Sequence, residues 1–140
     1  MSNRIDKYTE TSKIRDTYSD FSVDLSPHPN TQDLMRATNE AAIKRSIRNL
    51  ISTNLFERPF QPKVGSKIRN LLFENASDEL AGLIQTYCRE TIDNYEPRVK
   101  VISVDAIYDD ANNAYKVNIF FYIINKTEPV GLSIILYRVR

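Results

Sequence analysis

Several residue types that build enzyme sites are scarce in this chain. Its 140 residues include one cysteine, Cys88, and one histidine, His28, and no tryptophan. A single cysteine excludes an internal disulfide and a zinc site built on several thiols, and a single histidine excludes any site that needs two histidines. With only three glycines, the chain has no phosphate-cradling loop and no dinucleotide fingerprint. We therefore expect no cofactor and no metal.

The sequence also lacks long apolar runs and a strong net charge. No run approaches the ~20 apolar residues that span a bilayer, and the N-terminal residues contain no signal-peptide core. The net charge of +1 argues against a surface built throughout to hold nucleic acid or anionic membrane. A hydrophobic share of 41% and a charged share of 26% are typical of globular proteins. We expect a soluble protein of a reducing compartment, with one domain and an arm.

Charge is unevenly distributed along the chain. Residues 36–69 carry a net charge of +6, and residues 70–113 carry a net charge of −6. Such a dipolar chain can orient itself against charged neighbours, or its two halves can fold onto one another and neutralise. The basic half also leaves nucleic-acid binding as a further function class, which predicts an affinity that falls steeply with salt.

The N-terminal segment differs in composition from the rest. Residues 1–32 are polar, with isolated apolar side chains and no sustained period. Alone, such a segment buries too little apolar surface to offset the entropy lost on ordering. We expect an N-terminal arm over residues 1–32, which orders on a neighbouring surface, and a domain over residues 33–140.

Three segments of the domain are predicted to be helical. Apolar residues recur at three- and four-residue intervals between Asp33 and Asn54, where the helix either fills the segment or begins near Thr38, which can cap it. A short helix follows from Ser66, and Ser77 then caps the best-defined helix. The buried stripe expected on that helix, with Cys88 as a small core residue and not a nucleophile, comprises Leu80, Leu83, Ile84, Tyr87, Cys88, Thr91 and Tyr95.

The C-terminal part is predicted to form three antiparallel strands. They span roughly residues 98–108, 115–124 and 132–140, because apolar and polar residues alternate there. The predicted fold class is therefore α+β, with a small sheet covered by helix on one face and by another chain on the other. The last strand leaves an open edge. Either a partner strand completes this edge by β-augmentation, or Arg138 and Arg140 blunt it with charge.

Two proline-containing segments are candidate binding or packing sites. The loop 57–65 holds Phe60 between two prolines, and we expect its ring to plug the domain's own core, the alternative being that it is offered to a partner. The run Glu96-Pro97-Arg98 joins helix to sheet at a stiff corner. Its opposite charges can form a local ion pair or face the charges of a partner, and both interpretations stay open.

The motifs follow one another in a specific order. They are Tyr18-Ser19-Asp20, Glu57-Arg58-Pro59-Phe60, Pro62, Gly65, Leu71-Leu72-Phe73-Glu74, an amphipathic helix, Tyr95-Glu96-Pro97-Arg98 and a β-rich tail. In this order they resemble the small baseplate wedge subunit of contractile-tailed phages of the T-even type and the related baseplate subunit of type VI secretion systems. The resemblance covers about residues 18–140. Each motif alone is weak, whereas their order and spacing are specific.

The resemblance implies a structural, non-enzymatic protein of the virion tail baseplate, assembled in the host cytoplasm and present in multiple copies around the tail axis. Its implied partners are the larger baseplate wedge subunits, the tail sheath protein and tube-proximal hub proteins, with no nucleic acid and no membrane. The implied fold is similar to the C-terminal domain of the sheath protein. The implied role is to join the wedge core bundle to the first sheath ring and to template sheath assembly by strand exchange.

The same resemblance also carries an alternative function and an assignment of residues to the proposed roles. Family members have also been labelled lysozyme-like, so a cell-wall hydrolase of the tail is the alternative function, motivated otherwise only by abundant carboxylates. No catalytic residue is expected. The chain departs from the family pattern in its long arm and in Lys63-Val64 before the glycine.

The implied sites are Glu96, Pro97 and Arg98 for the wedge core bundle, Leu132, Ile134 and Leu136 for sheath strand exchange, and Arg58, Pro59, Phe60 and Gly65 as a structural motif.

Overall fold

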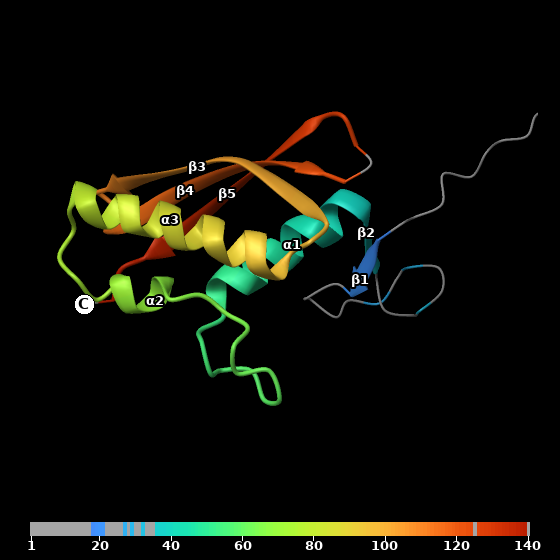
Figure 1. Ribbon diagram of the computed structural model, residues 1–140, viewed down its shortest axis with the longest axis horizontal. Coiled ribbons are helices and arrows are strands. Elements are labelled where there is room, and N and C mark those ends of the chain that lie inside the picture. Colours follow the sequence, from blue (N-terminus) through green and yellow to red (C-terminus); the bar gives the residue numbers. More distant parts are fainter. Residues whose placement is uncertain are drawn as a thin grey trace, which may run out of the picture.

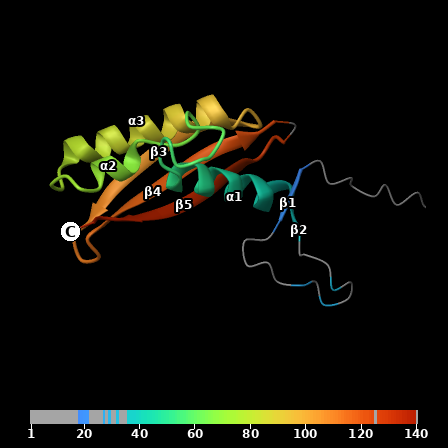
Figure 2. The same ribbon diagram turned by 90° about the horizontal axis from the view of Figure 1, so that it is seen from below.

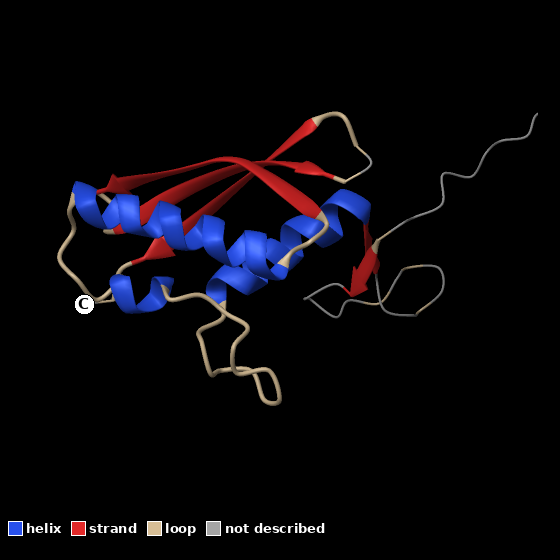
Figure 3. Ribbon diagram, viewed as in Figure 1, coloured by secondary structure: helices blue, strands red, loops and turns tan. Residues whose placement is uncertain are grey.

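The computed structural model describes residues 18–21, 27, 29, 32, 36–124 and 126–139. These residues form an α+β fold of helices packed on an antiparallel sheet of order β3-β4-β5, as predicted (Figure 1 and Figure 3). A two-stranded ribbon, β1 and β2, precedes the helices. The elements are β1 (Ser19–Phe21), β2 (Arg36–Thr38), α1 (Asn39–Ser52), α2 (Ile68–Leu71), α3 (Asp78–Tyr95), β3 (Val99–Asp109), β4 (Ala114–Ile123) and β5 (Pro129–Tyr137).

The helices cover one face of the sheet. Figure 1 and Figure 2 both place α1, α2 and α3 on the same side of β3, β4 and β5. Along β5 buried and exposed residues alternate strictly, and in β4 the alternation holds after its first residue. This is the pattern of a sheet that packs one face on a core. No described element covers the opposite face, on which Phe120, Tyr122 and Ile135 are exposed.

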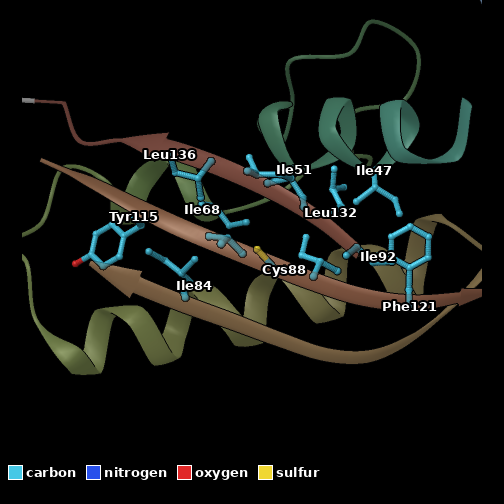
Figure 4. Packing of buried hydrophobic residues seen from close by; sticks show 14 of the residues in the cluster. Ile47, Ile51, Ile68, Ile84, Cys88, Ile92, Tyr115, Phe121, Leu132 and Leu136 are labelled. Atoms are coloured by element: carbon cyan, nitrogen blue, oxygen red, sulfur yellow. The ribbon is translucent and has the colours of Figure 1, made fainter. Parts of the chain in front are cut away.

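The core lies between the helices and the sheet. Figure 4 shows side chains of α1 and α3 meeting those of β4 and β5 in one cluster. Cys88 lies in its middle with no exposed surface, and burial raises the pKa of its thiol to about 12. The prediction that Cys88 is an unreactive core residue is therefore confirmed. The labelled members are Ile47, Ile51, Ile68, Ile84, Cys88, Ile92, Tyr115, Phe121, Leu132 and Leu136.

The ends of α3 follow from its sequence. The Ser77 side chain caps the helix by accepting a hydrogen bond from the backbone N–H of Leu80 at 3.1 Å, as predicted. The predicted stripe is right for most positions but wrong for Leu83 and Tyr95, which are 45% and 37% exposed. At 100° per residue, Leu83 lies about 140° around the helix from Cys88, which points it away from the core. Ile92 is fully buried in its place.

The start of α1 corrects one prediction. The segment from Asp33 is not helical throughout, because β2 pairs with β1 and α1 begins only at Asn39, close to the alternative start at Thr38. The backbone N–H of Asn39 donates to the carbonyl of Tyr18 at 2.6 Å. A contact 21 residues away thus fixes where the helix begins. β1 lies within the segment predicted to be an arm, and the boundary between arm and domain stays a prediction.

Candidate protein-binding site

The corner after α3 folds its acid inward. Glu96 is 3% exposed, and its carboxylate accepts hydrogen bonds from the guanidinium of Arg98, from Nε to Oε1 at 2.5 Å and from Nη2 to Oε2 at 2.7 Å. The Ser46 hydroxyl of α1 donates a third, to Oε2 at 2.6 Å. This is the two-pronged pairing that arginine makes with carboxylates. The interpretation as a local ion pair is confirmed.

The surroundings of Glu96 favour its ionised form. Burial alone would raise the pKa of this carboxyl, but the hydrogen bonds from Arg98 and Ser46 outweigh burial and hold the pKa below its ordinary 4.5. The hydrogen bonds that Arg98 donates to this carboxylate raise the pKa of Arg98 above its ordinary value. At neutral pH the corner therefore holds one negative and one positive charge, which pair with each other. It links α3 to α1 across the beginning of the sheet.

Part of the corner remains on the surface. Pro97 is exposed, and the Arg98 side chain is 31% exposed. Its guanidinium carbon lies 5.4 Å from the centroid of the Tyr18 ring, within the range of a cation–π contact. The groups that the predicted Glu-Pro-Arg motif presents outward are therefore the proline ring and one edge of the guanidinium, while Glu96 holds that guanidinium in place.

The loop between α1 and α2 points its aromatic rings outward. The prediction that Phe60 plugs the core is wrong, because Phe60 is 100% exposed and Phe56 is 79% exposed. The loop closes on itself instead: the N–H of Phe56 donates to the carbonyl of Pro62 at 2.8 Å, and the N–H of Gln61 donates to that of Arg58 at 3.3 Å. The core that Phe60 was expected to fill is filled by isoleucines of α1 and α3.

Gly65 closes the base of this loop. Its φ is +151°, and a Cβ atom at this position would lie 2.6 Å from the carbonyl oxygen of Asn54. Only glycine allows the two chain segments to approach so closely. Next to it, the Ser66 hydroxyl donates to the carbonyl of Ile51 at 2.7 Å, and the Tyr95 hydroxyl donates to the carbonyl of Lys63 at 2.5 Å.

A surface hollow of about 240 Å³ lies between α1 and the loop that carries Arg58, with Tyr95 at the end of α3 also lining it. Ser46, which binds Glu96, lines it from α1, and Arg58 lines it from the loop. No hydrogen bond or ion pair holds the Arg58 side chain within the described residues, so this exposed cation is available to a partner. Neither Ser46 nor Phe56 was singled out by sequence reasoning, because their roles depend on contacts distant in the chain. The lining residues are Asp20, Ser46, Asn49, Leu50, Arg58, Gln61, Val64 and Tyr95.

The third predicted site lies on the edge strand β5. The side chains of Leu132, Ile134 and Leu136 are 6%, 6% and 9% exposed and belong to the core. Beyond the last pair of the ladder, the N–H of Arg138 donates to the carbonyl of Asn113 at 3.0 Å. Bonded and non-bonded pairs alternate in an antiparallel ladder, so the backbone groups of the three buried residues point towards β4. Those of the alternate residues, Gly131, Ser133, Ile135 and Tyr137, point out of the edge.

The two edges of the sheet are not equivalent. The pairing of β3 with β4 shifts register between Val101 and Ser103, and Nη2 of Arg89 donates to the carbonyl of Ile102 at 3.0 Å. A bulge and a bound carbonyl both hinder the addition of a strand at β3. β5 pairs with β4 without a shift from Pro129 to Tyr137. Among the described residues, nothing pairs with its outer side.

Arg138 does not blunt the edge of β5 as the alternative supposed. Its Nη1 donates to Oδ1 of Asn113 at 3.1 Å and its Nη2 to the carbonyl of Glu74 at 2.6 Å. The guanidinium thus ties the end of β5 to the β3–β4 turn and to the segment before α3. Arg140 lies outside the described residues.

The carboxylates give little basis for acid catalysis. A glycosidase-type general acid needs a raised pKa, with a second carboxylate across the substrate. Within the described part of the chain, Glu40, Glu96 and Asp109 have a shifted pKa, and each is shifted downward. The described residues contain no helix long and apolar enough to cross a membrane, and no cluster of three or more potential metal ligands.

Comparison with known proteins gives a consistent result. A family model described as baseplate wedge protein gp25 matches residues 37–126. Baseplate wedge protein gp25 of Enterobacteria phage T4 is 32% identical over 99 residues, which cover 69% of this chain and 74% of the phage protein.

Two solved structures share the fold. A crystal structure described as a candidate tail lysozyme from Geobacter sulfurreducens has a TM-score of 0.66 and 25% identity, covering 70% of this chain and 89% of that one. A chain of the anti-feeding prophage baseplate has a TM-score of 0.68 and 24% identity, covering 79% and 89%.

Proposed function

Because the chain belongs to the baseplate wedge protein gp25 family, we propose that it joins the wedge of a contractile tail to the first ring of the sheath. The chain is a structural component of the tail baseplate, where the family name places its members. The finer proposal is that an incoming strand of the sheath protein pairs with β5 and that later sheath rings copy this arrangement. The open, regular edge of β5 carries the proposal.

The backbone of β5 is suited to accept a strand. Leu132, Ile134 and Leu136 anchor β5 through their buried side chains and their hydrogen bonds to β4. The intervening residues leave N–H and C=O groups at the edge in an unbroken row, which is the template for strand addition. The domain can therefore gain a strand without breaking any bond of its own.

The wedge contact is proposed at the corner after α3. Pro97 and the exposed edge of Arg98 meet the wedge core bundle, while Glu96 and Ser46 fix the orientation of the guanidinium. This assigns Glu96 a positioning role and leaves Pro97 and Arg98 as the contacting residues. Larger wedge subunits and the sheath protein thus bind at different parts of the domain.

The strand proposal is tested by a proline at the edge. Ile135→Pro removes an N–H that β4 does not use, so the domain should keep its fold while an added strand loses a hydrogen bond and meets the ring. Ile135→Ala is the matched control, since it removes the same side chain and keeps the N–H. We expect baseplates with the proline variant to incorporate the subunit but carry no sheath in electron micrographs, and those with the alanine variant to carry normal sheaths.

The controls separate loss of fold from loss of templating. Circular dichroism of the purified variants should give similar melting curves. Sheaths of normal length on baseplates that contain Ile135→Pro would refute strand addition at β5.

A further inference from the structure

The loop between α1 and α2 is a second candidate for contact with a partner, independent of β5. We propose that Phe56 and Phe60 form a docking element, here the aromatic loop, that inserts into an apolar hollow rimmed by carboxylates on another subunit of the same baseplate. The proposal rests on the chain being a baseplate component and not on strand exchange. Figure 1 shows the loop projecting from the helix side of the domain, away from the sheet.

The first argument is the exposure of two large rings. Phe56 is 79% exposed and Phe60 100%, within a loop of few residues. Aromatic side chains bury much apolar area per residue and dominate the energy of many protein interfaces. Leaving two of them in water has no benefit for this domain, whose core is complete without them.

The second argument is that the backbone holds the rings outward. Phe56 and Phe60 have φ values of 68° and 69°, a left-handed conformation that bulky residues rarely adopt. Such conformations persist only where the surrounding structure fixes them, and they are common at binding sites. Here the Phe56–Pro62 hydrogen bond and the close packing of Gly65 on Asn54 fix them. A rigid loop loses little freedom on binding, so the rings are preorganised.

The third argument is charge, which identifies the partner's chemistry. Arg58 lies between Phe56 and Phe60 in the sequence, and the described residues leave its guanidinium unpaired; Lys63 is also exposed. Glu57 is the one acid of the loop, and its Oε2 accepts from the N–H of Asn54 at 2.8 Å. Two cations against one acid leave the loop with a net positive charge, which fits a hollow bordered by Asp or Glu.

The neighbouring hollow favours a protein over a lipid surface. It holds about 240 Å³, and its lining includes the polar side chains of Ser46, Asn49 and Gln61 beside the apolar Leu50 and Val64. The polar groups of this lining can hydrogen-bond a side chain of a protein partner, whereas an acyl chain has no group to pair with them. A membrane contact through two phenylalanines and two cations is the competing outcome of the test.

The partner is identified by cross-linking from the loop in intact tails. Phe60 is replaced by p-benzoylphenylalanine in the full chain, tails are assembled and irradiated, and linked peptides are identified by mass spectrometry. We expect one site on another baseplate subunit, with carboxylates within a few residues of the linked position. The absence of a link, links only between copies of this chain, or a linked site without carboxylates would overturn the proposal.

The energy of the contact is tested with variants that suit the loop backbone. Asparagine tolerates a left-handed φ, so Phe60→Asn should leave the melting temperature unchanged or higher. Its affinity for purified wedges that lack this subunit should fall roughly thirtyfold, the loss expected for an interface hot spot. Arg58→Glu should lower the affinity at least about tenfold. Phe73→Asn is the matched control, because Phe73 is 60% exposed outside the loop, and it should change affinity less than threefold.

The outcomes separate this proposal from strand templating. If Phe60→Asn binds wedges like the wild type, the aromatic loop has no docking role, while sheath growth on those baseplates still reports on β5. If vesicles containing anionic lipid retain the wild type but not Phe60→Asn, the loop binds membrane and the protein partner is refuted. If Ile135→Pro baseplates grow sheaths but Phe60→Asn fails to bind wedges, only the proposal of strand templating is refuted, and the proposal for the aromatic loop stands.

Discussion

Removing the carboxylate of Glu96 should destabilise the domain as strongly as a core substitution. This acid accepts three hydrogen bonds, two from Arg98 at 2.5 and 2.7 Å and one from Ser46 at 2.6 Å, while only 3% of the residue is exposed. Breaking a fully buried pair costs about 3–5 kcal/mol, because one charge is left without its partner. Arg98 can turn partly to water, since its side chain is 31% exposed, which lowers the expected cost.

The expected effect of Glu96→Ala is therefore about 3 kcal/mol of unfolding free energy. That corresponds to a fall of roughly 10 °C in melting temperature for a domain of this size. Ser46→Ala removes one hydrogen bond to the charged acceptor and should cost about 1.5 kcal/mol. The double variant should lose less than the sum, because the Ser46 bond no longer exists once the carboxylate is absent.

The pH dependence has a definite sign. The folded-state pKa of Glu96 lies below the ordinary 4.5, so the unfolded chain binds a proton more readily than the folded one. The stability from this carboxylate is therefore present above about pH 4.5 and is lost as the pH falls through the lowered pKa. In Glu96→Gln the unfolding free energy should depend less on pH in that range, whereas the unfolding free energy of the wild type should fall there as the pH is lowered.

Urea denaturation followed by circular dichroism measures both effects. Asp93→Ala is the matched control, since Asp93 is an exposed acid near the same end of α3, and it should change the unfolding free energy by less than about 0.5 kcal/mol. If Glu96→Ala and Asp93→Ala lose equally little, the corner does not staple α1 to the sheet. An Ala variant that remains stable yet fails to enter wedges would instead show that the acid itself meets the partner.

The remaining predictions concern backbone and core. Gly65→Ala should lower the unfolding free energy by about 2–3 kcal/mol, because the new Cβ would lie 2.6 Å from the Asn54 carbonyl oxygen. Gly82→Ala should instead raise the unfolding free energy by up to about 1 kcal/mol, because no atom lies within 4 Å of the new Cβ. Thermal melts of the two variants test both predictions. Cys88→Ser should cost about 2 kcal/mol by burying a hydroxyl. Because burial raises the pKa of the Cys88 thiol to about 12, Ellman's reagent should not label it until the chain unfolds.

Local sequence signals predicted the elements that depend on local chemistry. The Ser77 cap set the start of α3, and strict alternation identified β4 and β5 within one to three residues. The sequence left two starts open for α1, and the one near Thr38 is right because β2 pairs with a strand that lies 15 or more residues away, which no periodicity reveals. The direction of Phe60 depends on its φ of 69°, a conformation that the residue type itself disfavours.

The candidate sites likewise combine features that local sequence predicts with features that depend on contacts distant in the chain. A local pairing of Glu96 with Arg98 was one of two interpretations that the sequence left open, and the third partner, Ser46, lies 50 residues earlier, where no local pattern indicates it. For β5, the sequence identified the strand and its buried face. Which backbone groups remain available depends on the register with β4, and the bond from the N–H of Arg138 to the carbonyl of Asn113 indicates which pairs are hydrogen-bonded.

This separation between side chains and backbone explains how β5 can serve both the core and a partner. Leu132, Ile134 and Leu136 use their side chains for the core and their backbone for β4, so the domain is complete without help. The residues between them contribute little to the core, and their backbone groups face outward. A strand added there gains hydrogen bonds and exposes no buried surface of this domain. The docking that we propose for the aromatic loop lies on the helix side, so it would leave the edge of β5 open to the proposed sheath strand.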